Sequence, residues 1–181
     1  MKTYKITSQK ELEQFKDEHG YKVNGNLEAD CSLDIQGRLL VDGYLWIKAG
    51  GYIKAGWSIK AGWSIKAGEY IEAGGYIEAG GSIKAGWSIK AGESYGISAG
   101  LQITCKDKLK YGLKCFAGIC NWRKISDEEK IITCGKHEGG VIEYGILKET
   151  GIKEEPMITL PDGRKFSAST IQEALKRYVI S

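Results

Sequence analysis

The chain has 181 residues, of which 42% are hydrophobic and 27% are charged, and it carries a formal net charge of +3. This balance excludes a chain that is disordered throughout, and so small a net charge does not by itself indicate a nucleic-acid-binding protein. The unusual figure is 25 glycines against two prolines.

The N-terminal residues lack the apolar core of a secretory signal peptide, and no apolar run approaches the roughly 18 residues of a membrane span. We therefore expect a cytoplasmic protein with no membrane association. In that compartment an odd number of cysteines predicts reduced thiols rather than a disulfide framework. The five are Cys31, Cys105, Cys115, Cys120 and Cys134.

Residues 1–20 are predicted to form an N-terminal cap. We expect a strand over residues 4–7 and a helix over residues 9–18, with Ser8 as N-cap and Glu11 completing a capping box. Placed before a repeat array, this helix would cover the open edge of the first coil, which would otherwise promote aggregation.

Residues 21–104 are predicted to form one repeat array. Within it, residues 47–92 carry a strict repeat of six residues, Ile-Lys/Glu-Ala-Gly and then two variable positions. The isoleucines fall at Ile47, Ile53, Ile59, Ile65, Ile71, Ile77, Ile83 and Ile89. Regular glycines exclude a helix, and the in-out-in alternation of Ile, charged residue and Ala is typical of a strand. The sequence predicts a mainly β fold, a β-solenoid with three six-residue sides and about 18 residues per coil.

The repeat extends back in degenerate form through Val41, Ile35, Ala29 and Val23, and it is predicted to end near Thr104. A period of 18 sorts the outward positions into three columns. Two have mixed charge and so compensate themselves: Gln36, Lys54, Glu72 and Lys90, and Asp42, Lys60 and Glu78. The third, Lys48, Lys66 and Lys84, predicts either a solvated face or one that binds phosphate or acidic side chains.

The position two residues before each isoleucine accepts Trp, Gly and Glu, so we place it at or outside a corner. Trp57, Trp63 and Trp87 are therefore expected to be at least partly exposed, as are Tyr52, Tyr70 and Tyr76. Exposed aromatics beside lysine are typical of interaction hot spots and stacking platforms. They could equally be buttresses that lie over glycines of the neighbouring coil.

Residues 105–155 are predicted to be a β-rich segment, after a strand over 101–105, with further strands over 109–116, 130–134 and 141–147. Its first part is basic and contains aromatics, and the remainder is acidic. The candidate binding residues there are Lys106, Lys108, Lys110, Tyr111, Lys114, Trp122, Arg123 and Lys124. Residues 156–181 predict a hairpin over 157–166 and a final helix over 170–178.

No residue set predicts catalysis, a metal site or a cofactor. The hexad resembles that of left-handed β-helix acyltransferases in its period, but those enzymes need a catalytic histidine. His19 and His137 both fall at predicted surface positions. Four of the cysteines could in principle bind zinc, but they lack Cys-x-x-Cys spacing, which favours small buried side chains. We expect a non-enzymatic protein.

The run Ile-Lys-Ala-Gly-Trp-Ser-Ile-Lys-Ala-Gly resembles small proteins encoded by phages and prophages of anaerobic gut bacteria. Cys-Phe-Ala-Gly-Ile-Cys-Asn-Trp-Arg, Ile-Thr-Cys-Gly-Lys and Tyr-Gly-Ile-Leu-Lys-Glu-Thr-Gly add to this resemblance, which covers residues 23–151. It implies an accessory anti-defence protein, with an anti-CRISPR inhibitor of a type II RNA-guided nuclease as the nearest functional class.

The leading hypothesis is an inhibitor that occupies a surface of a bacterial defence complex, with DNA or RNA as a further partner through the basic residues. The second is a structural solenoid that forms a homodimer, a larger oligomer or a virion module. The third is an acyltransferase. Sedimentation at several concentrations tests the second, and protection by coenzyme A against heating tests the third.

Overall fold

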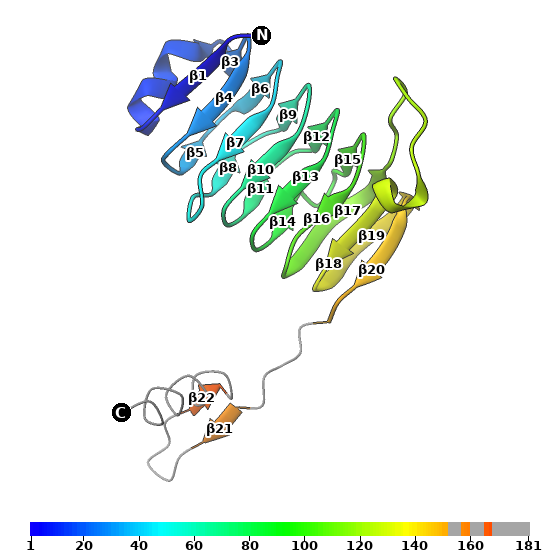
Figure 1. Cartoon of the computed structure of the whole chain (residues 1–181). Helices are drawn as coiled ribbons and strands as arrows, with labels where there is room; N and C mark the ends of the chain where they lie inside the picture. The colour runs from blue at the N-terminus through cyan, green and yellow to red at the C-terminus, as the bar shows by residue number, and fades with distance from the viewer. Residues whose placement is uncertain (152–156, 160–164, 168–181) are drawn as a thin grey trace, which may run out of the picture. The chain divides into compact units, whose positions relative to one another are not determined.

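The computed structural model describes residues 1–151, 157–159 and 165–167, and the chain divides into two units, Met1–Gly151 and Ile152–Ser181. The first unit is a β-solenoid of about six turns (Figure 1). In the second, β21 (Met157–Thr159) pairs antiparallel with β22 (Lys165–Ser167), as the predicted hairpin requires. The helix predicted over residues 170–178 lies outside the described residues.

The solenoid has three faces of parallel strands, which we number in the order in which each coil visits them. The first face is one eight-stranded sheet. Its strands are β1 (Thr3–Ile6), β4 (Asn26–Ala29), β7 (Leu45–Ile47), β10 (Ile65–Ala67), β13 (Ile83–Ala85), β16 (Ile103–Thr104), β18 (Ile131–Cys134) and β20 (Ile146–Glu149).

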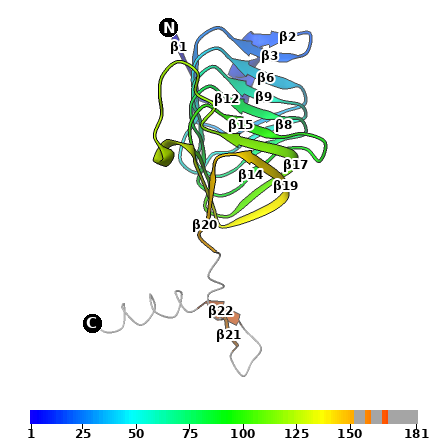
Figure 2. The ribbon, with the colours of Figure 1, turned by 90° about the vertical axis from the view of Figure 1, so that its right-hand side faces the viewer.

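The second and third faces form one twelve-stranded sheet because β17 (Lys108–Ala117) bends from one to the other. The second face contains β5 (Leu33–Ile35), β8 (Ile53–Ala55), β11 (Ile71–Ala73) and β14 (Ile89–Lys90). The third contains β3 (Gly20–Val23), β6 (Arg38–Val41), β9 (Ile59–Ala61), β12 (Ile77–Ala79) and β15 (Ile97–Ala99). The last coil adds β19 (Lys136–Tyr144), which pairs with β17 (Figure 2).

Inward side chains stack in columns to form the core. In each repeat the isoleucine and the alanine are buried and the residue between them faces outward. Because a column continues from coil to coil, an isoleucine in the middle of the array, such as Ile71 or Ile83, stacks between isoleucines of the coils on either side. Removal of this apolar area from water drives assembly of the array.

The predicted register of the early coils is wrong by two residues. Leu45, and not Ile47, pairs with Ile65, and Leu33 pairs with Ile53. In these coils Leu45 lies in the isoleucine column and Ile47 lies in the alanine column. Because both residues are apolar and both face inward, the repeat of six fits either alignment. The 48–51 turn takes up the two extra residues, since Leu45 and Ile65 are twenty apart while Ile53 and Ile71 are eighteen apart.

The solenoid continues beyond the end predicted near Thr104. Parallel pairing joins Ile103 to Ile132, and then Ile132 to Leu147. The hexad is lost there because residues 118–130 form an inserted loop, and because cysteine and tyrosine replace the regular isoleucine and alanine. Unit one therefore includes most of the segment that we predicted as separate.

The N-terminal segment differs in kind from the predicted helix. η1 (Gln9–Phe15) is a 3₁₀ helix, and after it β2 (Lys16–Asp17) pairs antiparallel with β3. Leu12 is fully buried. The Gln9 side-chain amide hydrogen-bonds the backbone of Asp34, donating to its carbonyl and accepting from its N–H at 2.9 Å. It thus occupies the exposed edge of β5, as a neighbouring strand would.

The acidic residue of the predicted capping box acts one residue earlier than expected. Glu11 accepts a hydrogen bond from the Thr7 backbone N–H at 2.9 Å, and Ser8 makes no side-chain cap contact with the helix backbone.

The Tyr111 side chain fills the core of the solenoid near its C-terminal end. It lies in the column that Ala73 and Ala91 occupy in earlier coils, is 2% exposed, and its hydroxyl has no hydrogen-bond partner among the described residues. Tyr111→Ala should lower the free energy of unfolding by about 3 kcal/mol through the cavity it leaves. Tyr111→Phe should change it by less than about 1 kcal/mol, because no hydrogen bond is lost. Urea denaturation of both variants checks this, and an equal loss in both would contradict it.

Candidate binding surface

The three tryptophans predicted at corners are exposed, at 69% for Trp57, 59% for Trp63 and 61% for Trp87. Each occupies a different corner of the coil. The Trp57 corner joins the second face to the third, the Trp63 corner joins the third to the first, and the Trp87 corner joins the first to the second. The structure therefore does not bring the three together into one aromatic platform.

The predicted column of three lysines is wrong in its first member. Lys66 pairs with Trp46 on one side and with Lys84 on the other. Lys48 lies two residues away, in the turn after β7, where its Nζ is 3.6 Å from an Asp30 carboxylate oxygen. The cause is the two-residue register shift, which puts Trp46 in the column instead.

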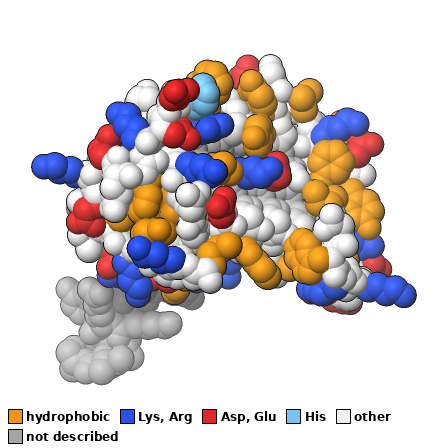
Figure 3. Space-filling view, turned by 90° about the horizontal axis from the view of Figure 1, so that it is seen from above, with side chains coloured by type: hydrophobic (Ala, Val, Ile, Leu, Met, Phe, Trp, Pro, Cys, Tyr) orange, Lys and Arg blue, Asp and Glu red, His pale blue; other side chains and the backbone are white. Residues whose placement is uncertain are grey.

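After the same correction the second-face column still alternates in charge, while the third-face column keeps one pair of opposite charges. On the second face Asp34 replaces Gln36 next to Lys54, and Lys90 Nζ lies 2.8 Å from Glu72. On the third face Leu40 replaces Asp42, and Lys60 Nζ lies 2.8 Å from Glu78. Basic and acidic side chains are accordingly interspersed on the surface seen in Figure 3.

Much of the basic segment is neutralised by acidic residues that lie later in the chain. Three of its predicted binding residues are ion-paired: Lys108 with Glu138 (3.5 Å), Lys114 with Glu143 (3.0 Å), and Arg123 with both carboxylate oxygens of Glu129. Tyr111 is buried, so its side chain is not available to a partner. Lys106, Lys110 and Lys124 are exposed and have no ion pair among the described residues.

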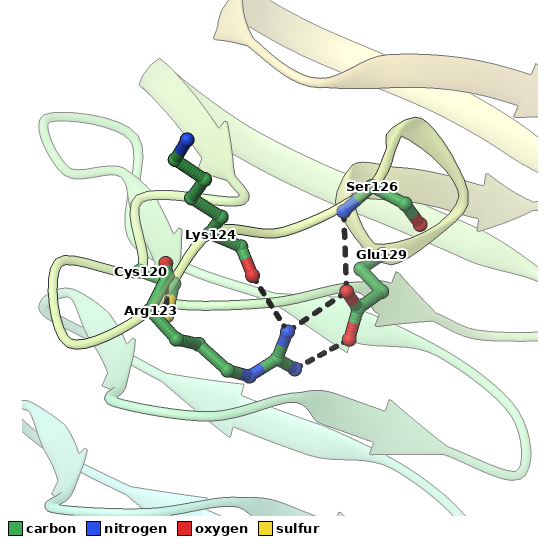
Figure 4. Close-up of polar contacts among 5 residues, drawn as sticks. All are labelled: Cys120, Arg123, Lys124, Ser126 and Glu129. Carbon is green, nitrogen blue, oxygen red and sulfur yellow. Dashed lines mark hydrogen bonds and ion pairs between the residues drawn. The ribbon is translucent and has the colours of Figure 1, made fainter.

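Glu129 joins Arg123 and Ser126 within the loop of residues 118–130 (Figure 4). Hydrogen bonds from the Arg123 guanidinium and the Ser126 backbone N–H hold the pKa of Glu129 down to about 2. The carboxylate is therefore charged at neutral pH. A third hydrogen bond from Arg123, donated to the Lys124 carbonyl, adds a contact within the same loop.

This loop runs back along the coils (Figures 1 and 2). Trp122, which it carries, lies beside Trp63. The two ring centroids are 6.4 Å apart. A Cβ on Gly100 would lie 3.0 Å from Trp122 Cη2, so the corner glycine leaves room for the indole. Trp122 is still 52% exposed. The contact joins residues almost sixty positions apart, and the hexad gives no indication of it.

We call Trp46, Trp63, Lys66, Lys84 and Trp122 the first-face surface. Lys66 Nζ lies 4.8 Å from the Trp46 ring centroid, a cation–π contact. Lys66 and Lys84 are adjacent on β10 and β13, and neither has an ion pair among the described residues. Two neighbouring lysines without counter-ions favour the approach of an anionic group. Trp46, which sequence reasoning missed, could have been found from the alternation Leu45–Trp46–Ile47, whose middle residue must face outward.

The thiols show no arrangement suited to a metal ion. Cys105, Cys115 and Cys134 are buried within the core columns. Across the described ranges no group of three or more His, Cys, Asp or Glu side chains is placed to hold a metal.

Comparison with protein-family models, with curated proteins and with solved structures gives no match. The resemblance to phage hexad-repeat proteins therefore stays a prediction. No helix within the described part of the chain has the length and apolar character to cross a membrane.

Proposed function

We propose that this chain is a non-enzymatic binding protein that inhibits a bacterial defence complex, a type II RNA-guided nuclease, in the cytoplasm of the host cell. The observation that carries the proposal is the first-face surface, where Lys66 and Lys84, which have no ion pair within the described part of the chain, lie on a sheet that also carries exposed tryptophans. The resemblance to phage-encoded proteins supplies the class of target.

The geometry suits occupation of a surface rather than chemistry. The ladder of parallel strands fixes the spacing of Lys66 and Lys84 at one coil, about 4.8 Å between strands. Lysine and tryptophan side chains presented this way can bind a phosphate backbone or an acidic protein patch without loss of much conformational entropy. Inhibition would result because the target can no longer engage its own ligand there.

Lys66→Glu/Lys84→Glu should abolish retention on heparin and on duplex DNA at low salt. For the unmodified protein, the logarithm of the DNA-binding constant should fall linearly with the logarithm of the salt concentration. Replacement of one of these lysines by an uncharged residue should reduce that slope by about one. Lys54→Glu is the matched control, since Lys54 is an exposed lysine on the second face. Failure of the unmodified protein to bind heparin or DNA at any salt concentration would remove the nucleic-acid part of the proposal.

The inhibitor part is tested with purified type II nucleases from several bacteria. Increasing amounts of the unmodified protein should slow cleavage of target DNA by at least one of them, and Lys66→Glu/Lys84→Glu should not. Protection of a plasmid in cells that express the same nuclease checks the result in vivo. Absence of inhibition across all orthologues would contradict the proposal.

A further inference from the structure

A cleft of about 600 Å³ lies at the N-terminal end of the solenoid, away from the first-face surface. The β2–β3 hairpin forms one side, and the Trp57 corner of the first two coils forms the other. Gln9, bonded to the backbone of Asp34, and Arg38, 3.0 Å from the Asp17 carboxylate, hold the two sides together. The cleft is therefore part of the folded scaffold and is not formed by a free loop.

The charges that line this cleft are mainly negative. Asp17 is already satisfied, since hydrogen bonds from the His19 backbone N–H and from Arg38 lower the pKa of its carboxyl. Glu18 and Asp34 also line the cleft, and among the described residues their carboxylates have no ion pair. Lys16, the lysine of the lining, is 3.3 Å from Glu13 and so is already paired.

Trp57 supplies an open aromatic wall. Its corner column has Gly37 in the preceding coil and Gly75 in the next, to which its backbone is hydrogen-bonded. Because neither glycine has a side chain, no neighbour in the column covers the indole, and it stays 69% exposed. Burial therefore does not account for a tryptophan at this position.

We propose that this cleft binds the guanidinium group of an arginine presented by a peptide or protein partner. A guanidinium is planar and cationic, so it can stack on the Trp57 indole while its N–H groups donate to Glu18 and Asp34. Charged hydrogen bonds of this kind are stronger than neutral ones. The preferred partner here has a charge opposite to that preferred by the first-face surface, and this inference does not depend on the function proposed above.

Titration of the full chain with the tripeptide amide Gly-Arg-Gly, monitored by NMR of the tryptophan indole N–H signals, tests the proposal. The signal that Trp57→Phe removes should shift, while that of Trp87 should not. The peptide with citrulline in place of arginine is nearly isosteric and uncharged, and it should bind at least about tenfold more weakly.

Glu18→Gln/Asp34→Asn should weaken arginine binding by about tenfold or more, since it removes both free carboxylates. Asp42→Asn, at the Trp63 corner, is the matched control and should bind as the unmodified protein does. The unshifted Trp87 signal in each variant shows that the fold is intact. No shift of the Trp57 signal at about 10 mM peptide, far above a millimolar Kd, or equal binding of the citrulline peptide, would overturn the proposal.

Discussion

Gly86→Ala should lower the free energy of unfolding by about 4 kcal/mol, at the upper end of what overpacking costs. Gly86 lies at the Trp87 corner, where the backbones of successive coils are in close contact. A Cβ built on it would lie well inside the van der Waals radius of the Gly68 carbonyl oxygen in the preceding coil. The coils would have to separate, which weakens the hydrogen bonds from the Gly86 and Trp87 N–H groups to Ala67 and Glu69.

Gly50→Ala is the control that separates crowding from backbone conformation. Gly50 has φ +79°, but a Cβ there would meet no atom within 4 Å. Its replacement should cost only about 1 kcal/mol, the strain of a left-handed alanine. Urea denaturation of both variants gives the comparison. A Gly86→Ala variant no less stable than Gly50→Ala would mean that the coils tolerate wider spacing at this corner.

The repeat explains why the fold was predictable. A period of six with glycine at each corner allows little besides three short strands per turn, and alternation then places the isoleucine and the alanine inward. The exposure of Trp57, Trp63 and Trp87 was predictable from the variety of residues at their position. What the period could not fix was register, because leucine and isoleucine both suit an inward column. The column that was predicted to contain Lys48, Lys66 and Lys84 therefore contains Trp46 in place of Lys48.

The basic segment shows a different limit of sequence reasoning. Its charges were counted along the chain, but the parallel coils return to the same face after 15 to 29 residues. The return from β17 to β19 takes about 28 residues and brings Glu138 and Glu143 beside Lys108 and Lys114. Burial of Tyr111, in contrast, could have been predicted. It stands two residues after Leu109, as each buried alanine stands two after its isoleucine.

The loop of residues 118–130 carries information that only the fold supplies. Its sequence shows neither the strand alternation nor the glycine period. Trp122 becomes part of the first-face surface because the loop turns back toward earlier coils, where the absence of a side chain at Gly100 makes space for it. Binding surfaces on repeat proteins thus depend on the interruptions as much as on the repeat.

The folded protein should lose stability steeply as the pH rises above about 9, because three thiols are held protonated in the core. Burial raises the pKa of Cys105 and Cys115 to about 12 and, with Glu149 adding to the effect, that of Cys134 to about 11. In the unfolded chain these thiols ionise near pH 8.5. Below that pH the three thiols are protonated in both the folded and the unfolded chain. Between that pH and the raised pKa values only the unfolded chain loses these protons, so the unfolded state gains stability relative to the folded state.

Each thiol should contribute a slope of about −1.4 kcal/mol per pH unit between its two pKa values, so three contribute about −4 kcal/mol per unit. Urea unfolding at pH 8, 9 and 10 under reducing conditions measures this. Cys105→Ala/Cys134→Ala should remove about two thirds of the slope, since both cysteines lie in the column otherwise filled by alanines such as Ala85 and tolerate that side chain. An unaltered slope in the double variant would mean that the core thiols are not what makes stability depend on pH in this range.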